Sequence, residues 1–191
     1  MALTPAFEIG LWNAWVLMII YFPLHPVLMI LIDKLVGTGN IYQKMASSPY
    51  NTTEKMAFIS GNILSFFLFL YSIFLPLKLG SAWFYAGIIV YLFGLVMFII
   101  AIVNIARTPI GEPFVKGLYR YSRHPMIFYG YFIFIGLGIA TASWLFLLIS
   151  ALIAILFAIY ILAEERGCCE RFGDSYREYM KRTPRWIGIP K

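Results

Sequence analysis

The stretch from Trp144 to Ala163, "WLFLLISALIAILFAIYILA", contains 20 residues and no Asp, Glu, Lys or Arg. A helix of about 20 apolar residues is long enough to cross the roughly 30 Å hydrocarbon core of a bilayer. Four further apolar runs precede it, at 9–32, 56–77, 81–105 and 126–142. Of the 191 residues, 61% are hydrophobic and only 13% are charged. The sequence therefore predicts an all-α polytopic membrane protein with about five transmembrane helices, forming a single membrane domain over the whole chain.

The basic residues are distributed unevenly between the connections. Of the 15 Lys and Arg residues, 14 lie between the first two runs, between the third and fourth, or after the fifth. Because Lys and Arg are enriched in cytoplasmic loops, we predict that the N-terminus lies outside and the C-terminus in the cytoplasm. This topology and the anionic lipid headgroups account for the net charge of +6 without a nucleic-acid partner.

Proline and small polar residues predict where the helices bend and end. Pro23 and Pro26 interrupt the first run, so we expect a kink or an early end there. Thr52 or Thr53 is expected to cap the second helix. Only the short stretch "ATAS", at 140–143, separates the last two runs, which predicts an antiparallel helical hairpin.

Two charged clusters flank this predicted hairpin, one at residues 112–125 and one at 164–190. A hairpin brings both clusters to the same side of the membrane. Cations that face carboxylates there form a pocket suited to a zwitterion, although Arg and Lys beside membrane spans are also ordinary anchors. The charge pattern alone leaves both interpretations open. The candidate pocket residues are Arg120, Arg123, His124, Glu164 and Glu165.

The cluster after the fifth run has a helical pattern of its own. Phe172, Tyr176 and Tyr179 recur at spacings of four and three, which predicts an amphipathic C-terminal helix on the cytoplasmic face or the membrane surface. Cys168 and Cys169 are adjacent, a spacing that fits neither a disulfide framework nor a metal site. We therefore predict no bound metal.

The sequence "GLYRYSRHP", at 117–125, resembles the Gly-x-Tyr-x-x-x-Arg-His-Pro motif of the isoprenylcysteine carboxyl methyltransferases and related membrane methyltransferases. The second cluster is similar to the family's second motif, with "EE" at 164–165, "FG" at 172–173 and "PRW" at 184–186. The resemblance implies a multi-span enzyme that transfers a methyl group from S-adenosylmethionine, with S-adenosylhomocysteine as product. The N-terminal three spans would occupy residues 1–106, and the cofactor-binding part residues 107–191.

The resemblance also implies roles for individual residues. The adenosine part of the cofactor would be held by Phe114, Val115, Lys116 and Tyr119. Arg123 and His124 would hold its carboxylate, and Glu164 or Glu165 its ammonium group. The predicted catalytic residues are Arg123, Glu164 and Glu165. The predicted cofactor-binding residues are Phe114, Val115, Lys116, Gly117, Tyr119, Arg123, His124, Pro125, Glu164 and Glu165.

The implied substrate is lipophilic, a small molecule or lipidated peptide that enters from the membrane lipids. The α-carboxylate of an S-isoprenylcysteine is the first candidate, and it is already ionised at pH 7. A phospholipid amine is the second; it must lose a proton, for which Glu164 or Glu165 would be the base. A membrane sterol reductase that uses NADPH and a non-catalytic membrane scaffold are the remaining interpretations.

Overall fold

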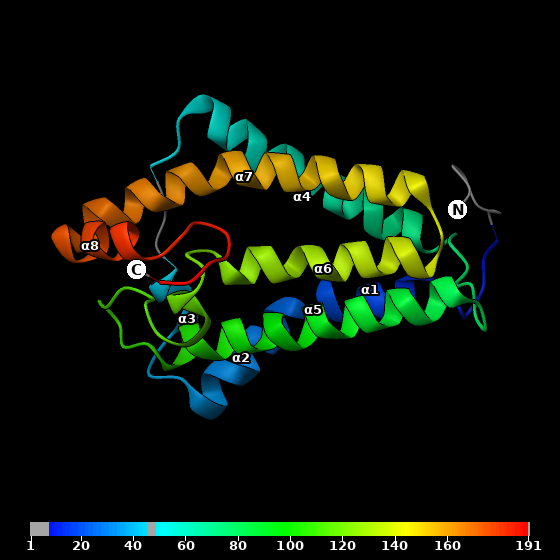
Figure 1. The fold of residues 1–191 in the computed structure, drawn as a ribbon, viewed down its shortest axis with the longest axis horizontal. Coiled ribbons are helices and arrows are strands. Elements are labelled where there is room, and N and C mark those ends of the chain that lie inside the picture. Colours follow the sequence, from blue (N-terminus) through cyan, green and yellow to red (C-terminus); the bar gives the residue numbers. More distant parts are fainter. Residues whose placement is uncertain (1–7, 46–48, 191) are drawn as a thin grey trace.

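The computed structural model describes residues 8–45 and 49–190, and regular structure within them is helical apart from one isolated bridge between Asn13 and Pro76. Four long helices run alongside one another, and the short helices α3 and α8 lie at one end of them (Figure 1). The elements, in chain order, are α1 (Trp15–Tyr21), α2 (His25–Val36), α3 (Ile41–Lys44), α4 (Thr52–Ser72), α5 (Ala82–Arg107), the 3-10 helix η1 (Gly117–Arg120), α6 (Pro125–Ala140), α7 (Trp144–Phe172) and α8 (Asp174–Arg182).

Three of the described helices, α4, α5 and α7, are long and apolar enough to cross a membrane. The pair α1 and α2, bent by 44°, makes a fourth if it is treated as one broken span. This break confirms the kink predicted at Pro23 and Pro26. Helix α6 is apolar but has only 16 residues. The all-α membrane class is therefore confirmed, whereas the count of five spans stays a prediction.

Helix α4 begins with a capping box, and here the predicted cap was wrong. Asn51, not Thr52 or Thr53, is the cap: its side chain accepts a hydrogen bond from the backbone N–H of Glu54. The Glu54 carboxylate accepts one from the backbone N–H of Asn51 in return, at 2.9 Å. Asn is at least as good a cap as Thr, and Glu at the third helical position completes the reciprocal pair.

Helix α7 is longer than the apolar run that predicts it. It continues nine residues beyond Ala163, to Phe172, and ends where Gly173 adopts a φ of +57°. The C-terminal helix, α8, therefore starts after Gly173, later than the pattern beginning at Phe172 predicted. Its Tyr176 and Tyr179 are buried. Because α7 is continuous through Glu164 and Glu165, both carboxylates are carried on a rigid helix.

Helices α5 and α6 approach each other closely because glycines replace larger side chains at the contact. A Cβ atom at Gly87 would lie 2.3 Å from the backbone nitrogen of Ala140. One at Gly136 would lie 2.4 Å from the backbone nitrogen of Tyr91. Neither position accepts a side chain at this separation, as is typical of small residues at membrane-helix interfaces.

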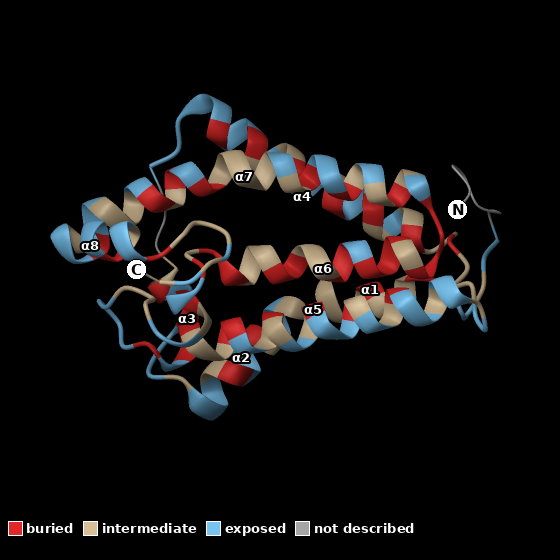
Figure 2. Ribbon diagram, viewed as in Figure 1, coloured by how far each residue is buried: buried red, intermediate tan, exposed pale blue. Residues whose placement is uncertain are grey.

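Helix α6 lies in the interior, as Figure 2 shows, while α4, α5 and α7 turn exposed faces outward. The chain reverses between α6 and α7 at residues 141–143, and Ser143 caps α7 by accepting a hydrogen bond from Phe146. The main packing partner of α6, however, is α5, and that of α7 is α4. The two helices of the predicted hairpin are therefore adjacent, but each packs mainly against a helix outside the hairpin.

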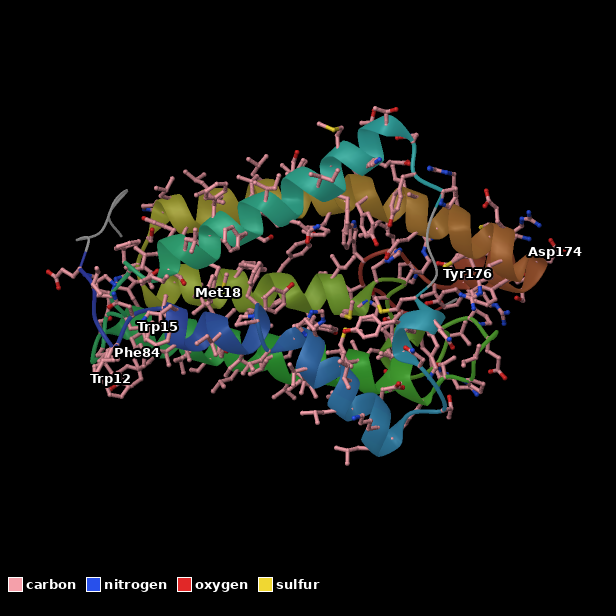
Figure 3. The ribbon with its side chains drawn as sticks, turned by 180° about the vertical axis from the view of Figure 1, so that it is seen from behind. Trp12, Trp15, Met18, Phe84, Asp174 and Tyr176 are labelled. Atoms are coloured by element: carbon pink, nitrogen blue, oxygen red, sulfur yellow. The ribbon has the colours of Figure 1, made fainter. Side chains whose placement is uncertain are left out.

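The two ends of the helical bundle differ in chemistry. Figure 3 places Trp12, Trp15 and Phe84 at one end, and Asp174 and Tyr176 at the opposite end. Tryptophan is enriched at membrane–water interfaces, so the first end has the composition expected there. The charged segments before α6 and after α7 gather at the second end, which carries the candidate site.

Candidate active site

The segment between α5 and α6 is fixed to the end of α5. Gly117 adopts a φ of +62°, and its position is so close to α5 that a Cβ atom would lie 2.1 Å from Oδ1 of Asn104. The same oxygen accepts a hydrogen bond from the backbone N–H of Leu118, at 2.8 Å. A glycine is required at this turn, and the turn places Tyr119, Arg123 and His124 against α7.

His124 lies between the two carboxylates of α7. Its Nδ1 is 3.3 Å from Oε2 of Glu164, and its Nε2 is 3.2 Å from Oε1 of Glu165. Burial alone would lower the pKa of His124, but the hydrogen bonds to Glu164 and Glu165 and their negative charges outweigh it and raise the pKa. His124 therefore lies between the two predicted carboxylates, and both of them favour its charged form.

Glu165 lies behind His124 and is almost fully buried. Arg185 binds it in a bidentate manner, with Nε 3.0 Å from Oε1 and Nη2 2.7 Å from Oε2. Nη1 of Arg123 is a third cationic neighbour, 3.1 Å from Oε1. Planar guanidinium groups match carboxylate geometry well, so Glu165 is occupied by the protein's own cations.

Glu164 is more accessible, with a side chain 26% exposed. Tyr160, one helical turn earlier on α7, donates a hydrogen bond from its hydroxyl to Oε1 of Glu164, at 2.7 Å. Oε2, the other carboxylate oxygen of Glu164, faces His124. The two adjacent carboxylates thus have different environments, and Glu164 is the more exposed of the two.

A cavity of about 280 Å³ lies in front of these groups. Its volume is near the lower end of the roughly 300–1,000 Å³ found for small-molecule sites. Five predicted site residues line it: Phe114, Tyr119, Arg123, His124 and Glu164. Aromatic rings line much of the rest, contributed by Tyr50, Tyr160, Phe172 and Tyr176.

Arg123 has unused donors at this cavity. Its Nε and Nη1 atoms are buried, and neither makes a hydrogen bond of good geometry with any of the described residues, although Nη1 is close to Glu165. Buried polar groups without a partner are rare in folded proteins and call for an explanation such as a missing ligand. An anionic group in the cavity would satisfy them.

The remaining predicted residues lie apart from the cavity wall. Val115 and Lys116 precede η1, Gly117 is its first residue, and Lys116 is exposed. Pro125 is the buried first residue of α6. Arg120 is exposed and, within the described part of the chain, does not line the cavity, so the structure does not bring it together with Arg123.

Three residues that line the cavity come from the N-terminal half and were not predicted. Lys44, Met45 and Tyr50 line the same cavity, from α3 and from the loop before α4. No sequence pattern links this loop to the two charged clusters. Tyr160 was also missed, although its spacing of four residues from Glu164 on one helix was a usable signal.

The described residues contain no group of three or more His, Cys, Asp and Glu side chains placed to hold a metal ion. The cavity is lined by the guanidinium group of Arg123, the imidazole of His124, the accessible carboxylate of Glu164 and several aromatic rings. Such a set is suited to a zwitterionic ligand that carries a flat ring system.

Comparison with known proteins supplies the family. The model of a family described as phospholipid methyltransferase matches residues 82–175, from the start of α5 to the beginning of α8. The match therefore includes η1, both charged motifs up to Ser175, and every residue predicted for the site. A search among curated proteins finds no match for the chain. Through residues 82–175 the chain belongs to the phospholipid methyltransferase family of integral membrane methyltransferases.

Proposed function

We propose that the cavity binds S-adenosylmethionine and that the protein transfers its methyl group to a lipophilic acceptor. The observation that carries this proposal is that Arg123, whose buried Nε has no hydrogen-bond partner among the described residues, lines the same cavity as the accessible carboxylate of Glu164. An amino-acid zwitterion needs both an anion receptor and a cation receptor. Family membership supports the methyl-transfer chemistry.

Each residue has a role in this proposal. Arg123 and His124 hold the carboxylate of the cofactor's methionine part, and Glu164 holds its ammonium group. Phe114 and Tyr119, whose ring centroids are 5.6 Å apart, contact the adenosine part from one side. When bound, S-adenosylmethionine supplies an electrophilic methyl group on a sulfonium centre.

The chain's contribution to the reaction is alignment and exclusion of water. Methyl transfer from a sulfonium cation to an anionic acceptor gives neutral products, so it is favoured in a site with little water. The aromatic walls of the cavity would provide such a site. Holding two reactants in the productive geometry supplies much of the acceleration in such a step. Val115, Lys116, Gly117 and Pro125 would assist through the backbone of the segment that leads into His124.

The first proposed acceptor is the α-carboxylate of an S-isoprenylcysteine. Four basic side chains, Lys44, Arg123, His124 and Arg171, line the cavity, against a single acidic one, Glu164, among the residues described. This excess favours an anionic acceptor, which needs no general base.

The second proposed acceptor is a phospholipid amine. It is favoured by the description of the matching family and by Glu164, whose accessible carboxylate would accept the proton that an amine must lose. For this acceptor Glu164 would act both in cofactor binding and as the base, whereas Glu165, being occupied by Arg123 and Arg185, would not be the base.

We also propose the arrangement in the membrane. Helix α6, at about 1.5 Å per residue, spans roughly 24 Å and would cross as a short fifth span packed against α5. The N-terminus would lie outside, and the C-terminus and active site in the cytoplasm. The positions of 14 of the 15 basic residues support this topology.

Transfer of a labelled methyl group tests the function and separates the acceptors. Purified protein is incubated with methyl-labelled S-adenosylmethionine and either S-farnesylcysteine or phosphatidylethanolamine vesicles. A carboxyl methyl ester releases its label as methanol in base, whereas an N-methyl group does not. Label in neither lipid fraction, from folded protein, would contradict the proposed function.

A further inference from the structure

The C-terminal segment after α8 crosses directly over the segment that carries the Arg-His pair. The backbone N–H of Arg123 donates to the carbonyl of Pro184 at 3.0 Å, and that of Gly188 donates to the carbonyl of Tyr121 at 3.0 Å. The hydroxyl of Ser122 donates to the carbonyl of Arg185 at 3.3 Å. We call residues 183–188 the strap. These bonds fix its position relative to Arg123 and His124.

Helix α8 holds the beginning of the strap. The hydroxyl of Tyr179 donates to the carbonyl of Tyr119 at 2.6 Å and lies 3.4 Å from that of Ser122. Tyr179 is buried, and the backbone N–H of Thr183 bonds to its carbonyl at 2.9 Å. These contacts fix the point at which the strap leaves α8, and they therefore also fix the strap relative to Arg123 and His124.

The strap side chain that reaches the site is Arg185. Its two hydrogen bonds take both oxygens of Glu165, so the carboxylate cannot rotate freely. The oxygen it shares, Oε1, is the one that Arg123 and His124 approach at 3.1 and 3.2 Å. Three cationic groups therefore depend on the orientation of one buried carboxylate.

We propose that Arg185 is a positioning residue of the site: it holds Glu165, and Glu165 in turn holds Arg123 and His124 at the cavity. Arg185 and the whole strap lie outside residues 82–175, the segment that the family comparison matches. This inference rests on the proposed function, because it concerns the groups that would bind the cofactor carboxylate. The contacts between Arg185, Glu165, Arg123 and His124 are present in the structure without a ligand.

The test compares Arg185→Met with Arg185→Lys, and with Arg182→Met as the matched control. Arg182 is exposed on α8, where its Nε donates a hydrogen bond to the carbonyl of Glu178 at 3.4 Å. Lys keeps the charge of Arg185 but cannot form two parallel hydrogen bonds. If Arg185→Met fails to fold, Arg185→Lys still reports on the bidentate contact.

The first measurement uses the ligand-free protein. The ring carbon signal of His124, labelled with ¹³C and assigned by comparison with His124→Gln, is followed by NMR as a function of pH. The charged groups that face His124 are Glu164 and Glu165 on α7, with Arg123 beside it and Arg185 behind Glu165. Arg185→Lys keeps the positive charge but frees Glu165 to rotate, so the contact between His124 and Glu165 weakens and the titration midpoint of His124 is expected to fall below that of wild type. A midpoint in Arg185→Lys equal to or above that of wild type overturns the inference.

The second measurement is the affinity for S-adenosylhomocysteine. Arg185→Met is expected to bind it about tenfold more weakly, the effect of losing roughly one charge-assisted hydrogen bond; Arg185→Lys lies between it and wild type, and Arg182→Met is unchanged. Equal affinity in all four proteins overturns the inference. If wild type does not bind the ligand, the proposed function fails, while the His124 titration still decides whether Arg185 acts through Glu165.

Discussion

The substitution Glu165→Gln tests the charge arrangement at the site with almost no change in volume. In the wild type, Glu165 balances Arg123, Arg185 and His124, with contacts of 2.7 to 3.2 Å. A neutral amide would leave Arg123 and Arg185 without this counter-charge, and His124 with that of Glu164 alone. Removing one partner of a buried ion pair costs about 3–5 kcal/mol. Because the side chain of Arg185 is 37% exposed, we expect the lower end, about 3 kcal/mol.

The assay is thermal unfolding in detergent, with Glu170→Gln as the control. Glu170 is an exposed residue five positions further along the same helix. For a chain of this length, about 3 kcal/mol corresponds to a fall in Tm on the order of 10 °C, whereas a surface substitution changes stability by about 0.5 kcal/mol or less. If both variants melt at the same temperature, the charge arrangement around Glu165 contributes little, and this reasoning is refuted.

Two further predictions concern His124 and the turn at Gly117. Because the pKa of His124 is raised in the folded protein, its ion pairs stabilise the protein fully below its ordinary pKa of about 6.5 and lose this effect as the pH rises through the raised value. The difference in Tm between wild type and His124→Gln should therefore be largest in mildly acidic buffer and vanish in alkaline buffer; a difference independent of pH would contradict this. Gly117→Ala should destabilise by about 1–2 kcal/mol more than Gly111→Ala, measured by the same melts. Both glycines have positive φ, but only Gly117 is pressed against Asn104, so equal losses would show that the contact is unimportant.

The sequence predicts the helical class and the composition of the site because both depend on local patterns. Long apolar runs can only be helices or closed barrels in a bilayer, and the Arg-His pair and the Glu pair lie at the ends of two of them. The break at Pro23 and Pro26 follows from the chemistry of proline. These features were predicted from residues that lie close together in the chain.

Most of what the sequence pattern does not predict depends on contacts between distant segments. The end of α7 at Gly173 rather than near Ala163 was missed for a local reason, because charged residues continue a helix as readily as apolar ones. The different environments of Glu164 and Glu165 do depend on distant contacts. They follow from which helix face meets Arg185 and which meets the cavity.

The contribution of Lys44 and Tyr50 to the cavity has the same cause. Both residues are distant in sequence from the two motifs. Lys44 is held at the site by the hydrogen bond from its Nζ to the carbonyl of Ala106 at the end of α5, at 2.6 Å. Tyr50 is held there by the stacking of its ring on Tyr160 of α7. The backbone carbonyl of Lys44 lies 3.3 Å from Nη1 of Arg171, a contact between α3 and α7 that has no sequence signature.

The most direct test of the account is calorimetric binding of S-adenosylhomocysteine to the detergent-solubilised protein, with Glu164→Gln and Glu170→Gln compared in parallel. The account predicts micromolar binding by wild type and Glu170→Gln, and binding at least about tenfold weaker by Glu164→Gln, which loses the carboxylate that holds the ammonium group. Equal affinity in all three proteins would contradict the role of Glu164. No binding by folded wild-type protein would contradict the central claim that this cavity is a cofactor site.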